Sequence, residues 1–233
     1  MKRPNKLGLV AILPMKAHSE RVSGKNFRNI AGKPLFRWIL DTLLSCPDID
    51  KVVINTDATE ILRDNGLFHG SANGRVIIRD RKPSLVGDMV SMNLIIKDDI
   101  KAVAADAYFM THTTNPLLKL KTIQALYQAY KDACAKGHDS LFTVNHLQTR
   151  FYTPEGLPIN HDPQNLLRTQ DLPVYCEENS VGYLFSRDSF YKTNARIGVN
   201  PILAETPMLE SVDIDEPSDW TMAESLLLNP NHM

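Results

Sequence analysis

The amino-acid sequence predicts an α/β protein, a three-layer α/β/α sandwich with a mainly parallel sheet. Two observations predict this class. Short apolar runs alternate along the chain with longer amphipathic stretches, which is the pattern of βαβ units. The length of 233 residues and the hydrophobic content of 43% suit one α/β domain with a sizeable core, and they do not suit two large independent domains.

Five short apolar runs are the expected strands, and they lie at residues 7–13, 51–55, 75–78, 107–111 and 140–144. Five amphipathic stretches are the expected helices, and they lie at residues 34–45, 59–65, 90–104, 121–135 and 218–228. Two residues suit the helix ends near which they stand. Pro34 is expected in the first turn of its helix, and Gly137 is expected at the C-terminal cap of the helix that ends near residue 135.

One part of the chain departs from the alternating pattern. We expect a single domain over residues 1–233 with a loop-rich excursion at about residues 145–182. Periodicity fades in this stretch, and turn-forming residues accumulate at Pro154, Gly156, Pro158 and Pro163, which is typical of loops with a short hairpin. The excursion is a candidate for a substrate cover or for a contact between subunits.

Charge and cysteine usage exclude several classes of protein. A formal net charge of −1 provides no general attraction to nucleic acid or to an anionic membrane, so a small-molecule partner is expected. Cys46, Cys134 and Cys176 are odd in number and widely spaced, which argues against a disulfide framework or a zinc site. No stretch approaches the roughly 18 apolar residues that cross a bilayer. These features favour a cytoplasmic enzyme.

The segment that follows the first expected strand carries the strongest functional signal. Residues 13–26 contain three cations, Lys16, Arg21 and Lys25. A buried parallel strand delivers such a loop to the carboxyl edge of the sheet, where backbone N–H groups and basic side chains can converge on phosphate oxygens. Neither common glycine motif is present, because Ser19 stands where a phosphate-binding loop would have its first glycine. We predict a polyphosphate site, with a solvated basic turn as the alternative.

The pattern Pro14-x-Lys16-x-x-Ser19, with Lys25-Asn26 and residues 30–35 after it, resembles the opening motif of the sugar-activating cytidylyltransferases. The resemblance is strongest to the acylneuraminate (CMP-sialic acid synthetase) family and extends to its 3-deoxy-manno-octulosonate relatives. Further matching stretches lie at residues 55–57, 81–88, 113–117, 170–173, 179 and 211–217. The resemblance implies a Rossmann-like, nucleotide-diphospho-sugar transferase-like fold. It also implies transfer of CMP from CTP to the anomeric hydroxyl of an acidic sugar, sialic acid or a related nonulosonate, with release of pyrophosphate.

This reaction needs positive charge more than covalent help, because the protein must neutralise a triphosphate and align the attacking hydroxyl. By resemblance, the catalytic cations are Lys16, Arg21 and Lys25. The nucleotide site implied in the same way consists of Pro14, Lys16, Ser19, Lys25, Asn26 and Arg81. Asn26 and Arg81 match positions that approach the cytosine and ribose, although Arg81 also lies in a basic stretch that could simply face solvent.

Two residues depart from the family pattern. Lys16 replaces the usual arginine, which keeps the charge and loses bidentate geometry. Glu20 replaces a lysine that is usual in the sialate branch, and it places negative charge beside a polyanion site. Arg21, which matches the octulosonate branch, is expected to compensate for Glu20.

Asp213-x-Asp215 is the candidate site for Mg²⁺ (or Mn²⁺). Alternation along a strand would place both carboxylates on one face, and hard oxygen ligands suit magnesium. The alternative is an exposed strand end in which Asp215 or Ser218 caps the following helix. The match of residues 216–219 to the family favours the metal site.

The resemblance also implies an acceptor-sugar site. Its expected residues are His112, Thr114, Arg168, Gln170 and Asn179. His112 aligns with a family glutamine and is expected to bind rather than to catalyse. An arginine is the natural partner of the sugar carboxylate, and Arg168 lies one residue from the family's position. Asp57 is expected either to shape the pocket or to cap the helix that begins near Thr59.

The expected partners are therefore CTP and an acidic sugar, and the chain is expected to form a homodimer or homotetramer. Two alternatives remain open at this point. One is a nucleotidyltransferase for an octulosonate or another acid. The other is a catalytically silent protein that binds nucleotide or sugar, which the replacements at Lys16 and Glu20 would favour.

Overall fold

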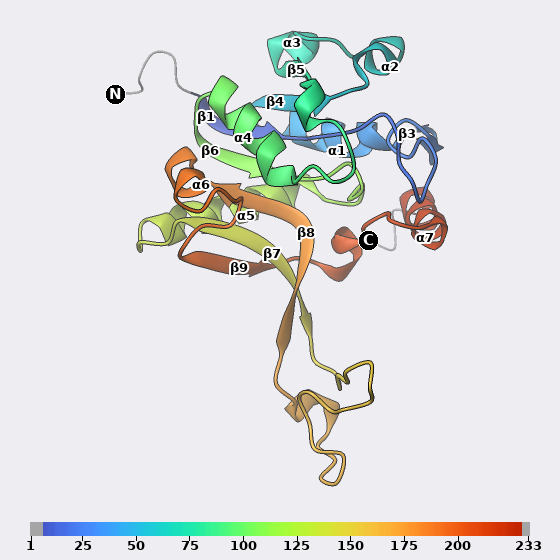
Figure 1. Cartoon of the computed structure of the whole chain (residues 1–233), viewed down its shortest axis with the longest axis vertical. Helices are drawn as coiled ribbons and strands as arrows, with labels where there is room; N and C mark the ends of the chain where they lie inside the picture. Colours follow the sequence, from blue (N-terminus) through green and yellow to red (C-terminus); the bar gives the residue numbers. More distant parts are fainter. Residues whose placement is uncertain (1–6, 230–233) are drawn as a thin grey trace.

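A seven-stranded sheet lies at the centre of the computed structural model, which describes residues 7–229 (Figure 1). Its strands are β1 (Leu7–Ile12), β4 (Ile49–Thr56), β5 (Val76–Asp80), β6 (Ala105–Met110), β7 (Ser140–Leu147), β8 (Tyr175–Phe185) and β9 (Pro201–Glu205). Their order across the sheet is β5-β4-β1-β6-β8-β7-β9. Only β8 runs antiparallel to its neighbours, and the other adjacent pairs are parallel. The mainly parallel sheet is confirmed; the ends of the expected domain, 1–6 and 230–233, lie outside the described residues.

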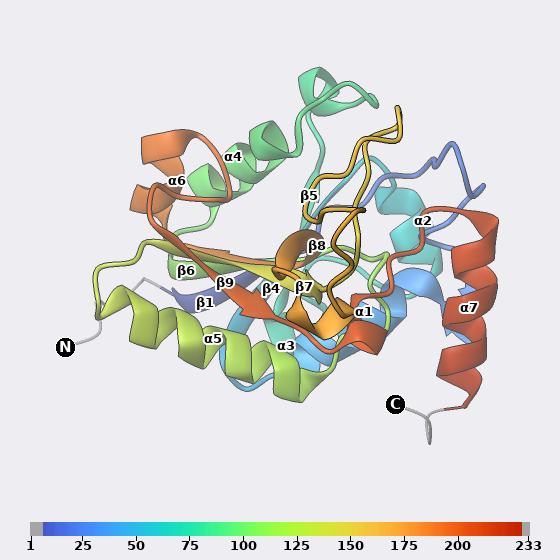
Figure 2. The same ribbon diagram turned by 90° about the horizontal axis from the view of Figure 1, so that it is seen from below.

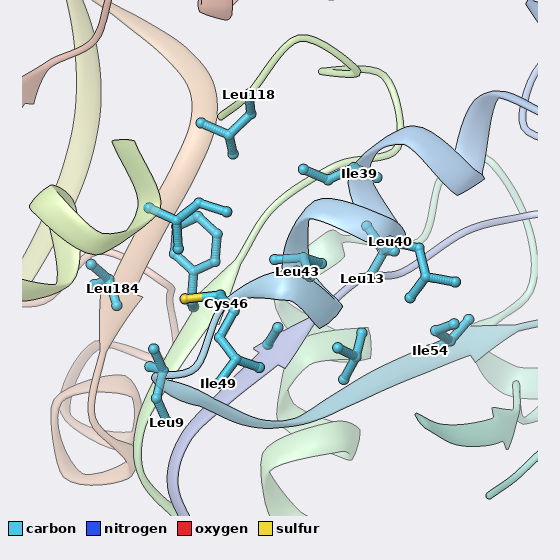
Figure 3. Packing of buried hydrophobic residues seen from close by; sticks show 14 of the residues in the cluster. Leu9, Leu13, Ile39, Leu40, Leu43, Cys46, Ile49, Ile54, Leu118 and Leu184 are labelled. Atoms are coloured by element: carbon cyan, nitrogen blue, oxygen red, sulfur yellow. The ribbon is translucent and has the colours of Figure 1, made fainter. Parts of the chain in front are cut away.

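Helices cover both faces of the sheet, which confirms the three-layer prediction (Figure 2). Helices α1 (Leu35–Ser45) and α5 (Leu120–Cys134) cover one face, and α4 (Met92–Ala102) and α6 (Arg187–Thr193) cover the other. Strand β1 shows why both layers are needed. Leu9 and Ala11 belong to the cluster beneath α1 and α5, and Val10 and Ile12 belong to the cluster beneath α4 and α6. A strand with both faces buried has a continuous apolar sequence. Figure 3 shows the cluster beneath α1 and α5.

The remaining elements lie around the sheet. They are β2 (Asn29–Ile30), β3 (Lys33–Pro34), α2 (Thr59–Asp64), α3 (Ser71–Gly74), η1 (Pro83–Leu85), η2 (Thr169–Asp171), η3 (Met208–Ser211) and α7 (Pro217–Leu228). Trp220 and Ala223 of α7 pack with Val22 and Ile30 in a third apolar cluster. This cluster attaches the last helix to the loop that follows β1. Among the helices of residues 7–229, none has the length and apolar character needed to cross a membrane.

The five expected strands and five expected helices are all present, with bounds shifted by a few residues. Gly137 has a positive φ of 92°, and the N–H groups of Gly137 and His138 donate to the carbonyls of Cys134 and Ala133. These two bonds form the expected C-terminal cap. The prediction for Pro34 is wrong, because Pro34 pairs with Asn29 in β3 and precedes the first helical turn with an extended ψ of 142°.

Two strands of the central sheet, β8 and β9, and one helix that covers it, α6, were not predicted. The second half of β8, residues 181–185, is an apolar run that carried a readable strand signal. Its first half is polar and exposed, so periodicity provides no signal there. Strand β9 and helix α6 have only five and seven residues, and such short elements depend on the sheet that they join.

Strands β7 and β8 continue beyond the body of the molecule as a two-stranded arm (Figure 1). Pairs from Val144 with Glu178 to Leu147 with Tyr175 hold the arm together, and a register shift between Phe142 and Val144 marks its root. Residues 148–174 form the loops at its end, which include the isolated bridge between Tyr152 and Pro158. The expected loop-rich excursion corresponds to this arm.

Candidate active site

A cavity of about 360 Å³ opens at the carboxyl edge of the sheet. Segments that follow β1, β5 and β6 form its walls, together with the segment that precedes α7. Ten residues predicted for the site line it: Pro14, Lys16, Ser19, Arg21, Lys25, Asn26, Arg81, His112, Thr114 and Asp215. Five further residues line the cavity that were not predicted to bind a substrate: Met15, Glu20, Asp88, Met92 and Thr113. The loop that is expected to bind polyphosphate and the segment that is expected to bind the sugar thus meet in one place.

Hydrogen bonds from three segments hold the loop after β1 in shape. The Ala17 N–H donates to Asp57 Oδ1 at 2.7 Å. Asn26 Nδ2 donates to the Lys16 carbonyl at 2.8 Å, and Asn26 Oδ1 accepts from the Thr113 hydroxyl at 2.6 Å. Asn26 is buried, so its side chain serves the shape of the loop. Asp57 also shapes the pocket, as expected, and the N-cap position of α2 is Ala58.

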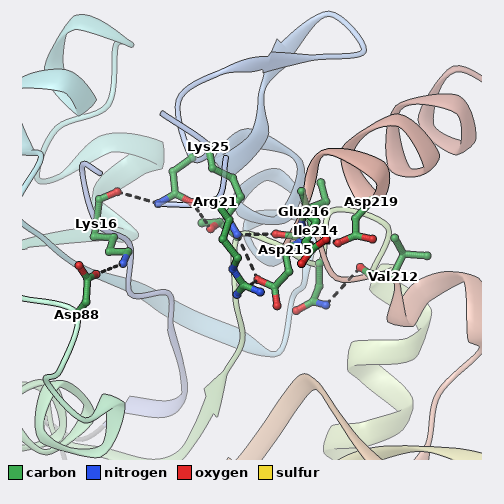
Figure 4. Close-up of polar contacts among 12 residues, drawn as sticks. Lys16, Arg21, Lys25, Asp88, Val212, Ile214, Asp215, Glu216 and Asp219 are labelled. Carbon is green, nitrogen blue, oxygen red and sulfur yellow. Dashed lines mark hydrogen bonds and ion pairs between the residues drawn. The ribbon is translucent and has the colours of Figure 1, made fainter. Parts of the chain in front are cut away.

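Each cation of the loop faces a carboxylate (Figure 4). Lys16 pairs with Asp88, and Arg21 pairs with Asp215 at 2.8 Å. Lys25 Nζ donates to the Ile214 carbonyl at 2.5 Å and lies 3.5 Å from Asp215 Oδ1. The Lys25 side chain is only 10% exposed, compared with 43% for Lys16 and 58% for Arg21. Lys25 is therefore the most rigidly placed of the three cations.

The acidic residues of the loop region have partners that the sequence did not predict. The hydrogen bond from Lys16 lowers the pKa of Asp88, and Glu20 also lies within hydrogen-bonding reach of Asp88. Arg21, which was expected to compensate for Glu20, makes its ion pair with Asp215. Glu20 therefore lies with Asp88 and Lys16 on one side of the pocket, and Arg21 lies with Lys25 and Asp215 on another.

Arg81 is tied to the base of the pocket. Its Nε donates to Asn55 Oδ1 at 3.1 Å, and its Nη2 donates to the carbonyls of Asn55 and Met15 at 2.8 and 3.0 Å. None of these bonds uses Nη1. The alternative of a solvated basic loop is therefore wrong for Arg81, whose guanidinium is held against the protein.

His112 contributes a neutral imidazole to the pocket. Its pKa is lowered from 6.5 to about 4, mainly by burial and further by the positive charges of Arg196 and Lys25, which outweigh the opposing effect of Asp215. The ring is uncharged near pH 7. It can therefore donate one hydrogen bond and accept another without adding charge.

The lowered pKa of His112 predicts a pH dependence of stability. The unfolded chain protonates this ring below about pH 6.5, whereas the folded chain resists protonation until about pH 4. The contribution of His112 to stability is thus complete above pH 6.5 and is lost as the pH falls toward 4. Denaturant titrations of wild type and His112→Gln should show that the loss of unfolding free energy between pH 7 and pH 5 is smaller in the variant, by about 1–2 kcal/mol. Equal losses in the two proteins would contradict an imidazole that stays neutral in the folded protein.

Asp213 and Asp215 flank Ile214 in an irregular segment between η3 and α7. The expectation that they lie on a strand is wrong. The Ile214 N–H donates to the Thr114 carbonyl at 2.9 Å, and its side chain is buried in the third apolar cluster. The neighbouring carboxylates are thereby kept out of that cluster. Burial raises the pKa of Asp213, and its Oδ1 is buried without a hydrogen-bond partner.

The alternative in which Asp215 or Ser218 caps the following helix is also wrong. Glu216 is the N-cap of α7 and forms a capping box with Asp219. Asp219 Oδ2 accepts from the N–H groups of Asp215 and Glu216 at 3.0 and 2.8 Å. Neither Asp215 nor Ser218 occupies the cap. In residues 7–229 no group of three or more histidine, cysteine, aspartate or glutamate side chains is arranged to hold a metal ion.

Three of the expected sugar-binding residues do not reach the cavity. Arg168 is in the arm, 72% exposed, and pairs with Asp171, and Gln170 belongs to η2 in the same loops. Asn179 is buried at the root of the arm, where its Nδ2 donates to Asn145 and Thr206. Likewise, no residue of the arm lines this cavity as a cover.

Comparisons with known proteins show the family of this chain. The sequence matches the family model for cytidylyltransferases over residues 10–231. It is 26% identical over 232 residues to the CMP-N,N'-diacetyllegionaminic acid synthase of Legionella pneumophila, covering 94% of this chain and 96% of that protein. It is 27% identical over 225 residues to N-acylneuraminate cytidylyltransferase B of Danio rerio, covering 94% of this chain and 51% of that protein.

The fold has a counterpart among solved structures. A CMP:2-keto-3-deoxy-manno-octonic acid synthetase complexed with CTP superposes with a TM-score of 0.66. The alignment covers 97% of this chain and all of that chain (100%), at 15% sequence identity. At this identity the similarity shows a common fold.

Proposed function

This chain belongs to the cytidylyltransferase family, and from that premise we propose that it transfers CMP from CTP to the anomeric hydroxyl of an acidic sugar. The sugar class proposed is a nonulosonate, such as sialic acid or a related nine-carbon acid. The observation that carries the proposal is the convergence of Lys16, Arg21 and Lys25 with His112 and Thr114 on one cavity. Three cations suit a triphosphate, and the polar segment after β6 suits a hydroxylated sugar.

The reaction forms a bond between the anomeric oxygen and the α-phosphorus and breaks the bond from that phosphorus to the β-phosphate oxygen. The hydroxyl gives up its proton to solvent water, and pyrophosphate leaves with the electron pair of the broken bond. Lys25, Arg21 and Lys16 would neutralise the triphosphate and the charge that develops on the leaving group. Arg81, through its free Nη1, would contact the cytidine portion of the nucleotide.

A divalent cation, Mg²⁺ or Mn²⁺, is part of the proposal. Asp215 lines the cavity, and Asp213 beside it has a buried Oδ1 without a hydrogen-bond partner. Magnesium in nucleotide sites commonly uses one or two carboxylates and completes its shell with waters and phosphates. Asp213 and Asp215 would hold the ion, which when bound neutralises phosphate charge. Asp215 would then release Arg21, which now pairs with it.

We further propose a homodimer, or a homotetramer built from it, in which the arm contacts another copy. The arm exposes several large apolar side chains: Tyr152, Leu157, Ile159, Leu166, Leu167 and Val174. Exposed apolar area of this extent favours a protein contact. Another copy would also provide an acceptor site to which Arg168 and Gln170 could contribute.

The arm proposal predicts the mass of the protein in solution. Light scattering after size exclusion should give two or four times the chain mass of 26.2 kDa. Leu157→Glu with Leu166→Glu should reduce the mass toward the monomer, because two charges would then have to be desolvated in the contact. Matched changes at Met89 and Phe68, which are exposed outside the arm, should leave the mass unchanged. A monomeric wild type would remove the proposal.

The proposed activity is tested by incubating the protein with CTP, Mg²⁺ and sialic, legionaminic, pseudaminic or octulosonic acid. Pyrophosphate release with a nonulosonate, at a higher kcat/KM with CTP than with UTP or ATP, is the expected result. Release with octulosonic acid alone would favour the octulosonate alternative. CTP binding by calorimetry without release for any sugar would favour the silent binding protein. We also propose a reducing compartment such as the cytoplasm, because Cys46, Cys134 and Cys176 are odd in number and widely spaced, which does not suit a disulfide framework.

A further inference from the structure

A buried carboxylate lies behind the nucleotide pocket, on the helix layer that includes α4. Asp99 is 1% exposed. Its Oδ1 accepts a hydrogen bond from Asn55 Nδ2 at 2.8 Å and lies 2.9 Å from Arg79 Nε. Burying an ionised carboxylate costs free energy unless hydrogen-bond or ion-pair partners compensate for the lost water. The proposed reaction assigns it no role.

Hydrogen bonds connect Asp99 to the pocket in three steps. The first joins Asp99 to Asn55, which is fully buried at the end of β4. The second joins Asn55 Oδ1 to Arg81 Nε at 3.1 Å. The third joins Arg81 Nη2 to the Met15 carbonyl at 3.0 Å. Met15 and Arg81 both line the pocket, so a carboxylate on α4 is coupled to the loop that is proposed to bind phosphate.

The Asn55 amide determines which group donates and which accepts along this chain of hydrogen bonds. An amide has one donor end and one acceptor end, whereas an ionised carboxylate only accepts. Asp99 therefore orients the NH₂ group of Asn55 toward itself, and Asn55 Oδ1 must then face Arg81. Without an acceptor at position 99, the buried NH₂ group of Asn55 would have no partner, which costs free energy. The Asn55 side chain would then be held at one end only, so it would fix the Arg81 guanidinium less firmly.

We propose that Asp99 is a positioning residue for the nucleotide, because it orients Asn55 and through it holds Arg81 at the pocket. This inference rests on the proposed function. It concerns binding of CTP and not the chemical step, because Asp99 touches neither the loop nor the cavity. Loss of the acceptor should weaken CTP binding, while the cations that act on the phosphates stay in place.

Asp99→Leu tests the inference, with Asp98→Asn as the matched control. Asp98 is the preceding residue on α4 and pairs with Arg79 and Lys82, but it makes no hydrogen bond to Asn55. In Asp99→Leu the KM for CTP should rise about tenfold, with kcat and the KM for the sugar within about twofold of wild type. Asp98→Asn should keep all three constants within about twofold.

A second variant separates positioning from stability. The exchange Asp99→Asn with Asn55→Asp reverses the hydrogen bond between the two side chains, because position 99 becomes the donor. Position 55 keeps an acceptor that faces Arg81, so the KM for CTP should stay within about threefold of wild type. This exchange decides the matter if Asp99→Leu does not fold. The inference is overturned if folded Asp99→Leu matches Asp98→Asn, or if the folded exchange variant retains the raised KM. A wild type that releases no pyrophosphate with any sugar would instead overturn the proposed function.

Discussion

Replacing Lys25 by methionine should lower kcat/KM for CTP by about 10²–10³-fold, the size of effect that follows loss of one preorganised donor. Lys25 is buried and fixed by the Ile214 carbonyl, so its ammonium group is in place before the nucleotide arrives. A donor that needs no rearrangement stabilises developing charge more than a mobile one. Lys16 and Arg21 are more exposed and bind Asp88 and Asp215, so replacing either one should cost less.

Steady-state pyrophosphate release over a range of CTP concentrations provides the measurement. Lys33→Met is the matched control, because Lys33 pairs with Asp41 and lies outside the cavity. Methionine keeps most of the unbranched stem of Lys25, and thermal unfolding checks that the loop remains attached. If Lys25→Met unfolds at a lower temperature but keeps its kcat/KM, Lys25 only ties the loop to residue 214, and the phosphates are held by other groups.

The fold was largely readable because its signals are local. The run that became β1 buries Leu9 and Ala11 on one face and Val10 and Ile12 on the other, and no surface strand would have this composition. Gly137 indicated a helix end, because glycine readily adopts the left-handed conformation of a C-terminal cap. The arm was readable only as a loss of periodicity, since its strands pair with each other and bury little apolar area. The arm projects from the sheet because β7 and β8 pair with each other. No local sequence pattern reveals this pairing.

Site residues that follow one strand could be predicted from the sequence, whereas contacts between distant segments could not. Lys16, Arg21 and Lys25 share one loop, so their convergence could be predicted. Asp88 reaches Lys16 from a segment 72 residues away, and its charge alone does not distinguish it from a solvated aspartate. Arg168 was expected at the sugar because of its guanidinium, but its position in the arm keeps it from the cavity of its own chain.

Asp215→Asn should lower kcat by about 10³-fold and remove the dependence of turnover on Mg²⁺, because an amide lacks the charge that recruits the ion. The fold should be retained. The Asp215 N–H still donates to Asp219, and Glu216 still caps α7. Turnover at increasing Mg²⁺ concentration, at saturating CTP, measures the effect.

The nucleotide affinity of the same variant should not fall together with its kcat. Asp215 is the counterion of Arg21 at 2.8 Å and lies 3.5 Å from Lys25 Nζ, so the amide leaves both cations free to attract a triphosphate. Calorimetry without Mg²⁺ should therefore show CTP binding that is as tight as in wild type or tighter. Weaker binding together with lost turnover would mean instead that the variant has disturbed the arrangement of the cations.

Asp88→Asn separates a metal ligand from a counterion. Asp88 also lines the cavity and pairs with one cation of the same loop, but it is distant in sequence from the buried, partnerless oxygen of Asp213. Asp88→Asn should change the CTP affinity in the same direction as Asp215→Asn, and turnover of the Asp88 variant should still depend on Mg²⁺. If both variants keep that dependence and a kcat near wild type, then Asp215 is a counterion only. The ion, if the reaction uses one, must then be held by the phosphates and by other oxygen atoms of the pocket.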